Sequence, residues 1–178
     1  MPNWCNNNCE ITGPSEIIEK LWETATEGEG LLSAMVPLHN GEWDYNDAVS
    51  TWGTKWDVGI NDSGLELDKH GKYATISGYF DSAWGPPDGA FNTWLIENET
   101  CEAELLFCEM SMDFCGDLES GTMSITDQTR DFWLADSVGS RINDTFDILD
   151  TMDEYAEEDQ NRALSEPLTL NNPEEDPS

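Results

Sequence analysis

Residues 4–14 read WCNNNCEITGP, and the side chains from Trp4 to Ile11 alternate roughly between apolar and polar. This alternation predicts a β-strand, because successive strand side chains point to opposite faces of a sheet. Thr12-Gly13-Pro14 predicts a turn at its end. A helix to about Thr26 is expected next, with Ser15 as its cap. Its apolar face follows helical spacing and consists of Ile17, Ile18, Leu21 and Trp22.

Two more strands and a second helix are predicted further along the chain. A β-hairpin is expected from residues 65–67 and 73–80, which flank a turn at residues 69–72. A helix is expected over about 88–98, with Phe91, Trp94 and Leu95 facing inward. Residues 31–38 form a short apolar stretch that ends at Pro37, and the polar and aromatic residues 40–50 predict a loop.

A strand over 103–110 and an edge strand over 122–125 complete the predicted sheet. The order strand, helix, strand, strand, helix, strand is typical of an α+β fold of the ferredoxin-like type. In that sandwich two helices cover one face of an antiparallel sheet. We therefore predict a ferredoxin-like domain over residues 1–121.

The last third of the chain differs in character, because its acidic residues are denser. A long acidic helix is predicted over about 131–162, with a possible bend at Gly139-Ser140. It belongs to an acidic, mainly helical extension over 122–164, and a disordered acidic tail is expected over 165–178. The predicted apolar stripe of the helix is Leu134, Val138, Ile142, Phe146, Leu149, Met152 and Tyr155 or Ala156. This stripe suits docking on the domain as well as a homodimer interface.

The net charge of −31 restricts the possible partners. Eight Trp, six Phe and four Tyr indicate a folded chain, because aromatic side chains at this density need burial. Nucleic acids and anionic membranes are expected to be repelled, since both are bound through clustered Lys and Arg. The attracted partner is a cationic protein surface, and nucleic-acid-binding proteins carry the most cationic surfaces.

No signal for export, a cofactor or catalysis is present. The first residues have neither a basic nor an apolar region, no apolar run approaches membrane-spanning length, and five cysteines are an odd number, so a cytoplasmic protein is expected. The cysteine and histidine spacing lacks the close pairs of a zinc site, so we predict no metal. Phosphate loops, nucleophile elbows and zinc-protease motifs are absent, so we predict no cofactor and no enzyme.

Three tryptophan-containing motifs occur in series: Met1-Pro2-Asn3-Trp4-Cys5-Asn6-Asn7, Trp52-Gly53-Thr54-Lys55-Trp56-Asp57 and Tyr79-Phe80-Asp81-Ser82-Ala83-Trp84-Gly85-Pro86-Pro87. In this order and spacing they resemble the YubB-type ferredoxin-like domain family of bacteriophages and plasmids, over about residues 1–116. The resemblance implies the fold and an origin on a mobile genetic element. It implies no reaction. Its motif residues here are Trp4, Trp52, Gly53, Lys55, Trp56, Asp57, Trp84, Pro86 and Pro87.

Two interpretations of the motif region stay open. Trp52, Trp56 and Trp84 either line a site for a small molecule or peptide, or hold loops together as core material, and we favour the second. The first predicts a deep pocket near Lys55. Lys55 is expected to form an ion pair with Asp57 or Asp81.

The acidic helix predicts the contact surface for a partner. Carboxylates recur at three- and four-residue steps away from the apolar stripe, although like charges at this spacing destabilise a helix. Such a row, with about 5.4 Å per turn, imitates the phosphates of a nucleic acid strand, which follow one another at about 3.4 Å. The predicted contact residues are Asp136, Asp144, Asp147, Asp150, Asp153, Glu154, Glu157 and Glu158.

These features predict a phage or plasmid accessory protein that mimics nucleic acid. Its expected partner is a cationic host protein of restriction, CRISPR or other anti-phage defence, or RNA polymerase, which it would inhibit. The alternatives are a binding module that uses the tryptophan motifs, adaptation to high salt, or mere solubility. Solubility alone needs only roughly 2–8 charges on a small domain.

Overall fold

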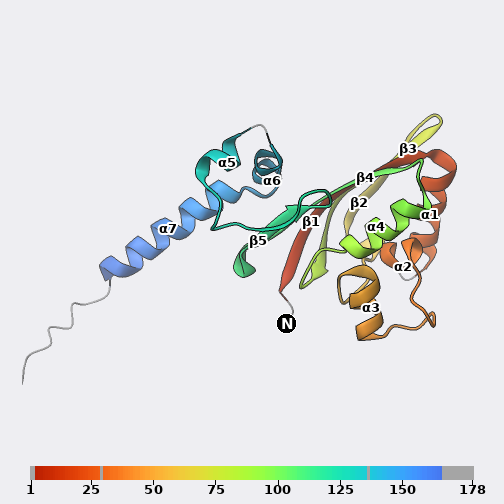
Figure 1. Ribbon diagram of the computed structural model, residues 1–178, viewed down its shortest axis with the longest axis horizontal. Helices are drawn as coiled ribbons and strands as arrows, with labels where there is room; N and C mark the ends of the chain where they lie inside the picture. The colour runs from red at the N-terminus through yellow and green to blue at the C-terminus, as the bar shows by residue number, and fades with distance from the viewer. Residues whose placement is uncertain (1–2, 29, 136, 166–178) are drawn as a thin grey trace, which may run out of the picture.

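The computed structural model describes residues 3–28, 30–135 and 137–165 of the chain (Figure 1). It is an α+β structure in which α1 to α4 lie on one side of a sheet and α5 to α7 on the other. The strands are β1 (Trp4–Pro14), β2 (Gly64–His70), β3 (Tyr73–Ala83), β4 (Glu102–Glu109), β5 (Phe114–Asp117) and β6 (Gly121–Ser124). The α-helices are α1 (Ser15–Glu27), α2 (Leu31–Met35), α3 (Tyr45–Trp52), α4 (Asp88–Glu97), α5 (Arg130–Leu134), α6 (Val138–Phe146) and α7 (Ile148–Ser165).

The sheet is open and antiparallel, with the strand order β2-β3-β1-β4-β5-β6. The predicted first strand lies in the middle of it, paired with β3 along its whole length and with β4 over Asn6–Thr12. The predicted hairpin, the helix at 88–98, the strand at 103–110 and the edge strand at 122–125 are confirmed, with boundaries shifted by a few residues at most. The α+β class is therefore confirmed, and the sheet gains β5, which was not predicted.

One face of β1 forms the main hydrophobic core. Cys5, Cys9 and Ile11 are buried at alternating positions, as the sequence alternation predicts, and pack with α1, α2 and α4. Phe91 and Trp94 of α4 join them. The first helix is also confirmed, but Ser15 does not cap it. Pro14 occupies the cap position, and the Ser15 hydroxyl donates instead to the carbonyl of Gly71.

The prediction of a loop over 40–50 is wrong in its second half, because α3 begins at Tyr45. The Asp44 carboxylate accepts hydrogen bonds from the backbone N–H groups of Asn46 and Asp47, which satisfies donors at the helix start. Gly53 ends the helix at a φ of +87°, a left-handed conformation that glycine adopts without strain. Polar residues therefore start a helix here.

The prediction of one long helix over 131–162 is also wrong, because three helices occupy this region. Ser137 and Ser140 form a reciprocal capping box that starts α6, and Asp147 ends α6 in the left-handed conformation at a φ of 52°. Each break satisfies backbone groups that a continuous helix would satisfy internally. The extension consequently folds back on itself instead of forming a single rod.

A second hydrophobic cluster lies on the opposite side of β4, under α5, α6 and the start of α7. Leu106 and Cys108 of β4 pack there with Trp133, Ile142 and Leu149. Ile142 and Leu149 of the predicted apolar stripe are thus buried within the chain, Val138, Phe146 and Met152 are half-buried, and Leu134, Tyr155 and Ala156 are exposed. Docking on the domain is confirmed, and a homodimer through this region stays a prediction.

The five cysteines are buried and unpaired, which predicts inert thiols. Burial raises the pKa of Cys5, Cys9, Cys108 and Cys115 to about 12, and it also raises the pKa of Cys101. Because the thiolate is the reactive form, we expect almost no reaction with a thiol-specific dye at pH 8 in the native protein. Five equivalents should react once denaturant is added. A thiol that reacts rapidly in the native protein would contradict the packing described here.

Candidate functional site

Exposed carboxylates on α6 and α7, and at the junction between these helices, form the first candidate surface, which we call the acidic helix surface. It comprises Asp144, Asp147, Asp150, Glu154, Glu157 and Glu158, all of them exposed. Of the other two predicted contact residues, Asp136 lies outside the described residues. Asp153 is exposed but engaged, because its two carboxylate oxygens accept from Arg130 at 3.0 and 3.1 Å. Arg130 therefore lowers the pKa of Asp153 and neutralises part of the row.

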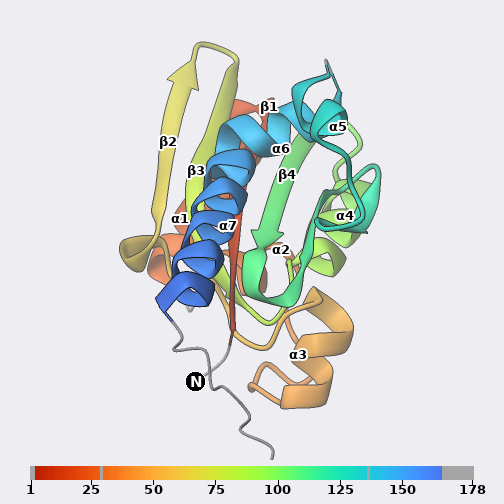
Figure 2. The ribbon, with the colours of Figure 1, turned by 90° about the vertical axis from the view of Figure 1, so that its left-hand side faces the viewer.

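The second half of α7 has no buried side. Ile148 and Leu149 are buried and Met152 is half-buried, but every residue from Asp153 to Arg162 is exposed. Figure 1 shows this helix leading away from the sheet, and Figure 2 shows it running obliquely in front of the strands. The carboxylates in this half of α7 are accordingly accessible from several directions.

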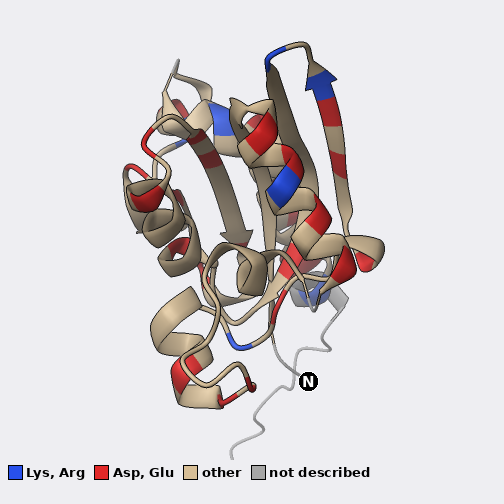
Figure 3. Ribbon diagram, turned by 90° about the vertical axis from the view of Figure 1, so that its right-hand side faces the viewer, with Lys and Arg blue, Asp and Glu red and all other residues tan. Residues whose placement is uncertain are grey.

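Acidic residues occur on strands, helices and loops alike, whereas Lys and Arg are few (Figure 3). Several of these cations are held by acids of the chain itself. Lys69 pairs with Glu19, Arg130 with Asp153, and Arg141 with Glu104. Arg141 also lies 3.9 Å from the largely buried Asp117, and so links α6 to β5. The acids that remain on the surface therefore create a strongly negative field.

The second candidate surface is aromatic, and we call it the tryptophan surface. It comprises Trp4, Trp43, Tyr45, Trp56 and Trp84, which are exposed by 37–50%. Trp4 and Trp56 have ring centroids 5.7 Å apart, and Tyr45 meets Trp84 edge to face at 6.1 Å. Exposed aromatic side chains in mutual contact are typical of binding surfaces rather than of a core.

Of the two interpretations of the motif tryptophans, core material or binding site, Trp52 fits the first, and Trp56 and Trp84 fit the second. Trp52 is core material, 2% exposed, and its indole N–H donates to the Val36 carbonyl at 2.8 Å. Trp56 and Trp84 are instead partly exposed beside Lys55. The ammonium of Lys55 lies 4.4 Å from the ring centroid of Trp56 and 5.0 Å from that of Trp84. Lys55 therefore forms cation–π contacts.

The predicted ion pair of Lys55 with Asp57 or Asp81 is not found among the described residues. Asp57 has another role, because its carboxylate accepts from the backbone N–H groups of Leu32, Ser33 and Val58 at 2.7, 3.0 and 2.7 Å. Two of these donors lie in the first turn of α2, where a negative charge is favourable. Asp57 thus joins the second motif to the helical layer.

The second and third motifs hold each other in place. The buried hydroxyl of Thr54 donates to the Ala83 carbonyl at 2.9 Å, and a Cβ on Gly53 would come within 2.8 Å of the Pro86 carbonyl. Trp84 has a φ of 72°, which is rare for a bulky residue and costs about 1–3 kcal/mol. Its N–H donates to the Asn3 carbonyl at 2.9 Å, so all three motifs meet at this strained position.

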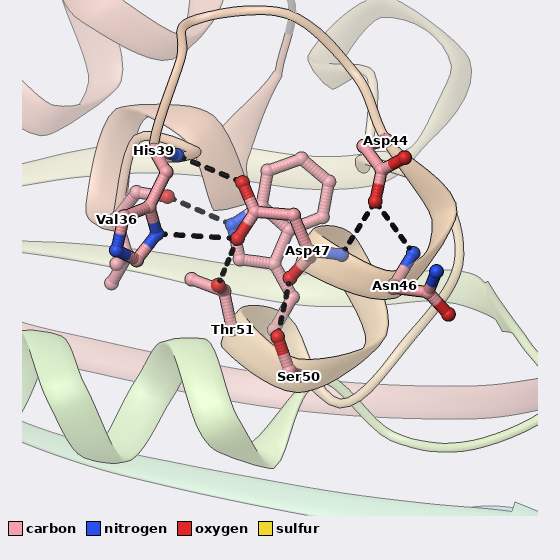
Figure 4. Close-up of polar contacts among 8 residues, drawn as sticks. Val36, His39, Asp44, Asn46, Asp47, Ser50 and Thr51 are labelled. Atoms are coloured by element: carbon pink, nitrogen blue, oxygen red, sulfur yellow. Dashed lines mark hydrogen bonds and ion pairs between the residues drawn. The ribbon is translucent and has the colours of Figure 1, made fainter.

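A hydrogen-bond network around Asp47 orients α3 (Figure 4). The Asp47 carboxylate accepts from the backbone N–H of His39 at 2.9 Å and from the Thr51 hydroxyl at 3.1 Å, and its other contact is the His39 ring. These hydrogen bonds, above all that from the His39 backbone, lower the pKa of Asp47. The His39 ring and the Thr51 hydroxyl contact the same oxygen of Asp47, Oδ1, and the network fixes the helix that carries Trp52.

Two cavities lie beside members of the tryptophan surface, one at Trp4 and one at Trp43. The deep pocket near Lys55 expected for a ligand-binding module is not found among the described residues. A cavity of about 280 Å³ lies instead beside Trp4, and Asp62 and Asp81 contribute to its lining. Within the same part of the chain, no group of three or more His, Cys, Asp or Glu side chains is arranged to hold a metal.

Two members of the tryptophan surface were missed from the sequence. Trp43 and Tyr45 lie in the segment interpreted as a loop, and the indole N–H of Trp43 donates to the Lys55 carbonyl at 2.9 Å. The presence of two large aromatic residues within a polar stretch was the sequence feature that could have indicated this surface. Pro86 and Pro87 lead directly into α4, and the Pro87 carbonyl accepts from the backbone N–H of Phe91 at 3.2 Å.

Comparison of the chain with models of protein families, with curated proteins and with solved structures returned no match. The resemblance to the YubB-type family therefore stays a prediction. None of the helices in the described part of the chain is both long and apolar enough to cross a membrane.

Proposed function

We propose that this protein is an acidic nucleic-acid mimic, which binds and inhibits a cationic nucleic-acid-handling protein through the acidic helix surface. The observation that carries the proposal is the second half of α7, where Asp153–Arg162 are exposed on all sides and rich in carboxylates. A helix that served only the fold would bury one face along its length. Here the docked residues end at Met152, and the acids continue beyond them.

The proposed setting is the cytoplasm of an infected or plasmid-bearing bacterial host, where the protein acts as an accessory protein without enzymatic activity. The candidate targets are restriction enzymes, CRISPR effectors, other anti-phage defence proteins and RNA polymerase. We also propose a ferredoxin-like sandwich for residues 4–109. The antiparallel order β2-β3-β1-β4 with α1 and α4 on one face supports this assignment.

Displacement of DNA tests the proposed function. A fluorescent DNA duplex is bound in turn to a purified restriction endonuclease, a CRISPR effector and a bacterial RNA polymerase, and the protein is titrated in. We expect the anisotropy to fall for at least one of them at low salt, and the effect to weaken as salt rises, because charge pairing is screened. Replacing Asp144, Asp147, Asp150, Glu154, Glu157 and Glu158 with Asn or Gln should weaken displacement by about tenfold or more.

A matched variant separates the effect of the acidic helix surface on displacement from the effect of the overall net charge. Replacing the exposed acids Glu16, Glu23, Glu27, Glu42, Glu97 and Glu99 with Gln removes the same six charges, so both variants change the net charge from −31 to −25. The control should retain displacement within about twofold. Equal losses in both variants would mean that only general acidity acts. A lack of displacement from every member of the panel would contradict mimicry of these targets.

A binding module built on the tryptophan surface is the second candidate. It is favoured by the exposure of Trp4, Trp56 and Trp84 and by the strained backbone that presents Trp84. Strain of this kind persists where the surrounding structure enforces it, and it concentrates at functional sites.

A further inference from the structure

The cavity beside Trp4 is lined by groups of two kinds. The apolar lining includes Trp4, Val58 and Phe80, while Asp62 and Asp81 supply carboxylates. Asp57 also borders the cavity, but its oxygens already accept three backbone hydrogen bonds. The two remaining acids have capacity left. Asp81 accepts from the Asn6 side chain through one oxygen only, and Asp62 is exposed, with no donor to its carboxylate among the described residues.

The chemistry of this lining selects a cation with a flat, weakly hydrated surface. An indole face attracts a cation, and a guanidinium both stacks on an aromatic ring and donates two parallel hydrogen bonds to a carboxylate. An ammonium group is not planar, so it can neither stack on the ring nor donate two parallel hydrogen bonds to one carboxylate. The adjoining part of the surface already holds one cation of the chain itself, since Lys55 lies over Trp56, and Trp56 contacts Trp4.

The size of the cavity is sufficient for a single long side chain. Its volume of about 280 Å³ lies just below the range of about 300–1,000 Å³ that is usual for small-molecule pockets. The surrounding exposed aromatic residues offer a further contact area for the polypeptide that carries this side chain. The field of a chain with a net charge of −31 also attracts basic segments.

We infer that the cavity beside Trp4 binds an arginine side chain of a partner polypeptide, with the guanidinium against the Trp4 indole and hydrogen-bonded to Asp62 and Asp81. The site is separate from the acidic helix surface and does not depend on nucleic-acid mimicry. It assigns the first and third motifs a role in recognition, and it leaves Trp52 in the core.

Short peptides test the inference. The probes are a glycine-flanked arginine peptide, the same peptide with citrulline, which has the same shape without the charge, the same peptide with lysine, and free arginine amide. Binding is followed through the indole N–H signals in ¹⁵N-resolved NMR spectra and by calorimetry. We expect the arginine peptide to shift the Trp4 signal and to bind about tenfold or more tightly than the citrulline peptide, with lysine between them.

Variants locate the binding. Asp62→Asn with Asp81→Asn, and separately Trp4→Ala, should each weaken arginine-peptide binding by about tenfold. The control Glu97→Gln with Glu99→Gln removes the same two charges from exposed positions outside the cavity and should change binding by less than about twofold. Equal binding of the arginine and citrulline peptides, or equal losses in the charge variants, would overturn the inference. Free arginine amide binding as tightly as the peptide would overturn it too, since the site would then serve a small molecule.

Discussion

Replacing Trp133 with alanine is expected to lower the free energy of unfolding by about 3–5 kcal/mol. Trp133 is 1% exposed and is the largest side chain of the second hydrophobic cluster, where its ring meets that of Phe132 at 5.0 Å. Its removal leaves a cavity between α5, α6 and β4 that the surrounding helices fill only in part. Denaturant titration followed by circular dichroism measures the loss, and hydrogen exchange should show faster exchange in α5 to α7 than in β1 and β3.

Two further substitutions make this expectation specific. Leu134 is the neighbour of Trp133 but is 64% exposed, so Leu134→Ala should change stability by no more than about 0.5 kcal/mol. The indole N–H of Trp133 is buried and has no hydrogen-bond acceptor among the described residues. Trp133→Phe removes this unsatisfied donor, which offsets part of the lost packing, and it should cost less than Trp133→Ala. If Trp133→Ala is as mild as Leu134→Ala, the extension is not held by this cluster.

Trp52→Ala is expected to cost a similar 3–5 kcal/mol, about the largest effect of any single change in the tryptophan motifs. The substitution removes a fully buried ring and also leaves the Val36 carbonyl without the indole donor at 2.8 Å. Trp56→Ala is the matched control, because the same residue type four positions later is 37% exposed, and its loss should cost about 1 kcal/mol or less. Comparable losses at both positions would mean that the tryptophan surface is structural throughout.

Much of the fold follows from sequence because its strongest patterns are local. The alternation of Cys5, Cys9 and Ile11 places β1, and the turn at Gly71 places the hairpin. The errors occur where side-chain capping decides the outcome. Asp44 starts α3 within a polar stretch, and Ser137 with Ser140 restarts the chain as α6, although an apolar stripe runs through the break. The stripe identifies Ile142 and Leu149 as buried, but it also includes the exposed Leu134, and it does not show where the backbone turns.

The candidate surfaces were only partly predictable for a different reason. The sequence indicates that carboxylates crowd the last third of the chain, but it does not show that Arg130, more than twenty residues away, is paired with Asp153. The sequence also does not distinguish the buried tryptophan of the motifs from the exposed ones. Exposure separates Trp52 from Trp56 and Trp84, and exposure depends on how α3 packs against α4 and the main core, which is a tertiary property.

The strand β4 carries a consequence for how this molecule tolerates change. Leu105 and Phe107 belong to one hydrophobic cluster, and Leu106 and Cys108 to the other. The side chains at four successive positions are therefore all buried. A substitution at any of them disturbs the packing of one of the two hydrophobic clusters, because none of the four side chains can turn toward solvent. A saturation-mutagenesis library should find its least permissive run here. The acids of α7 and the exposed aromatic residues lie outside that run. They can therefore be replaced by residues of other chemical types while the buried strand between them stays the same.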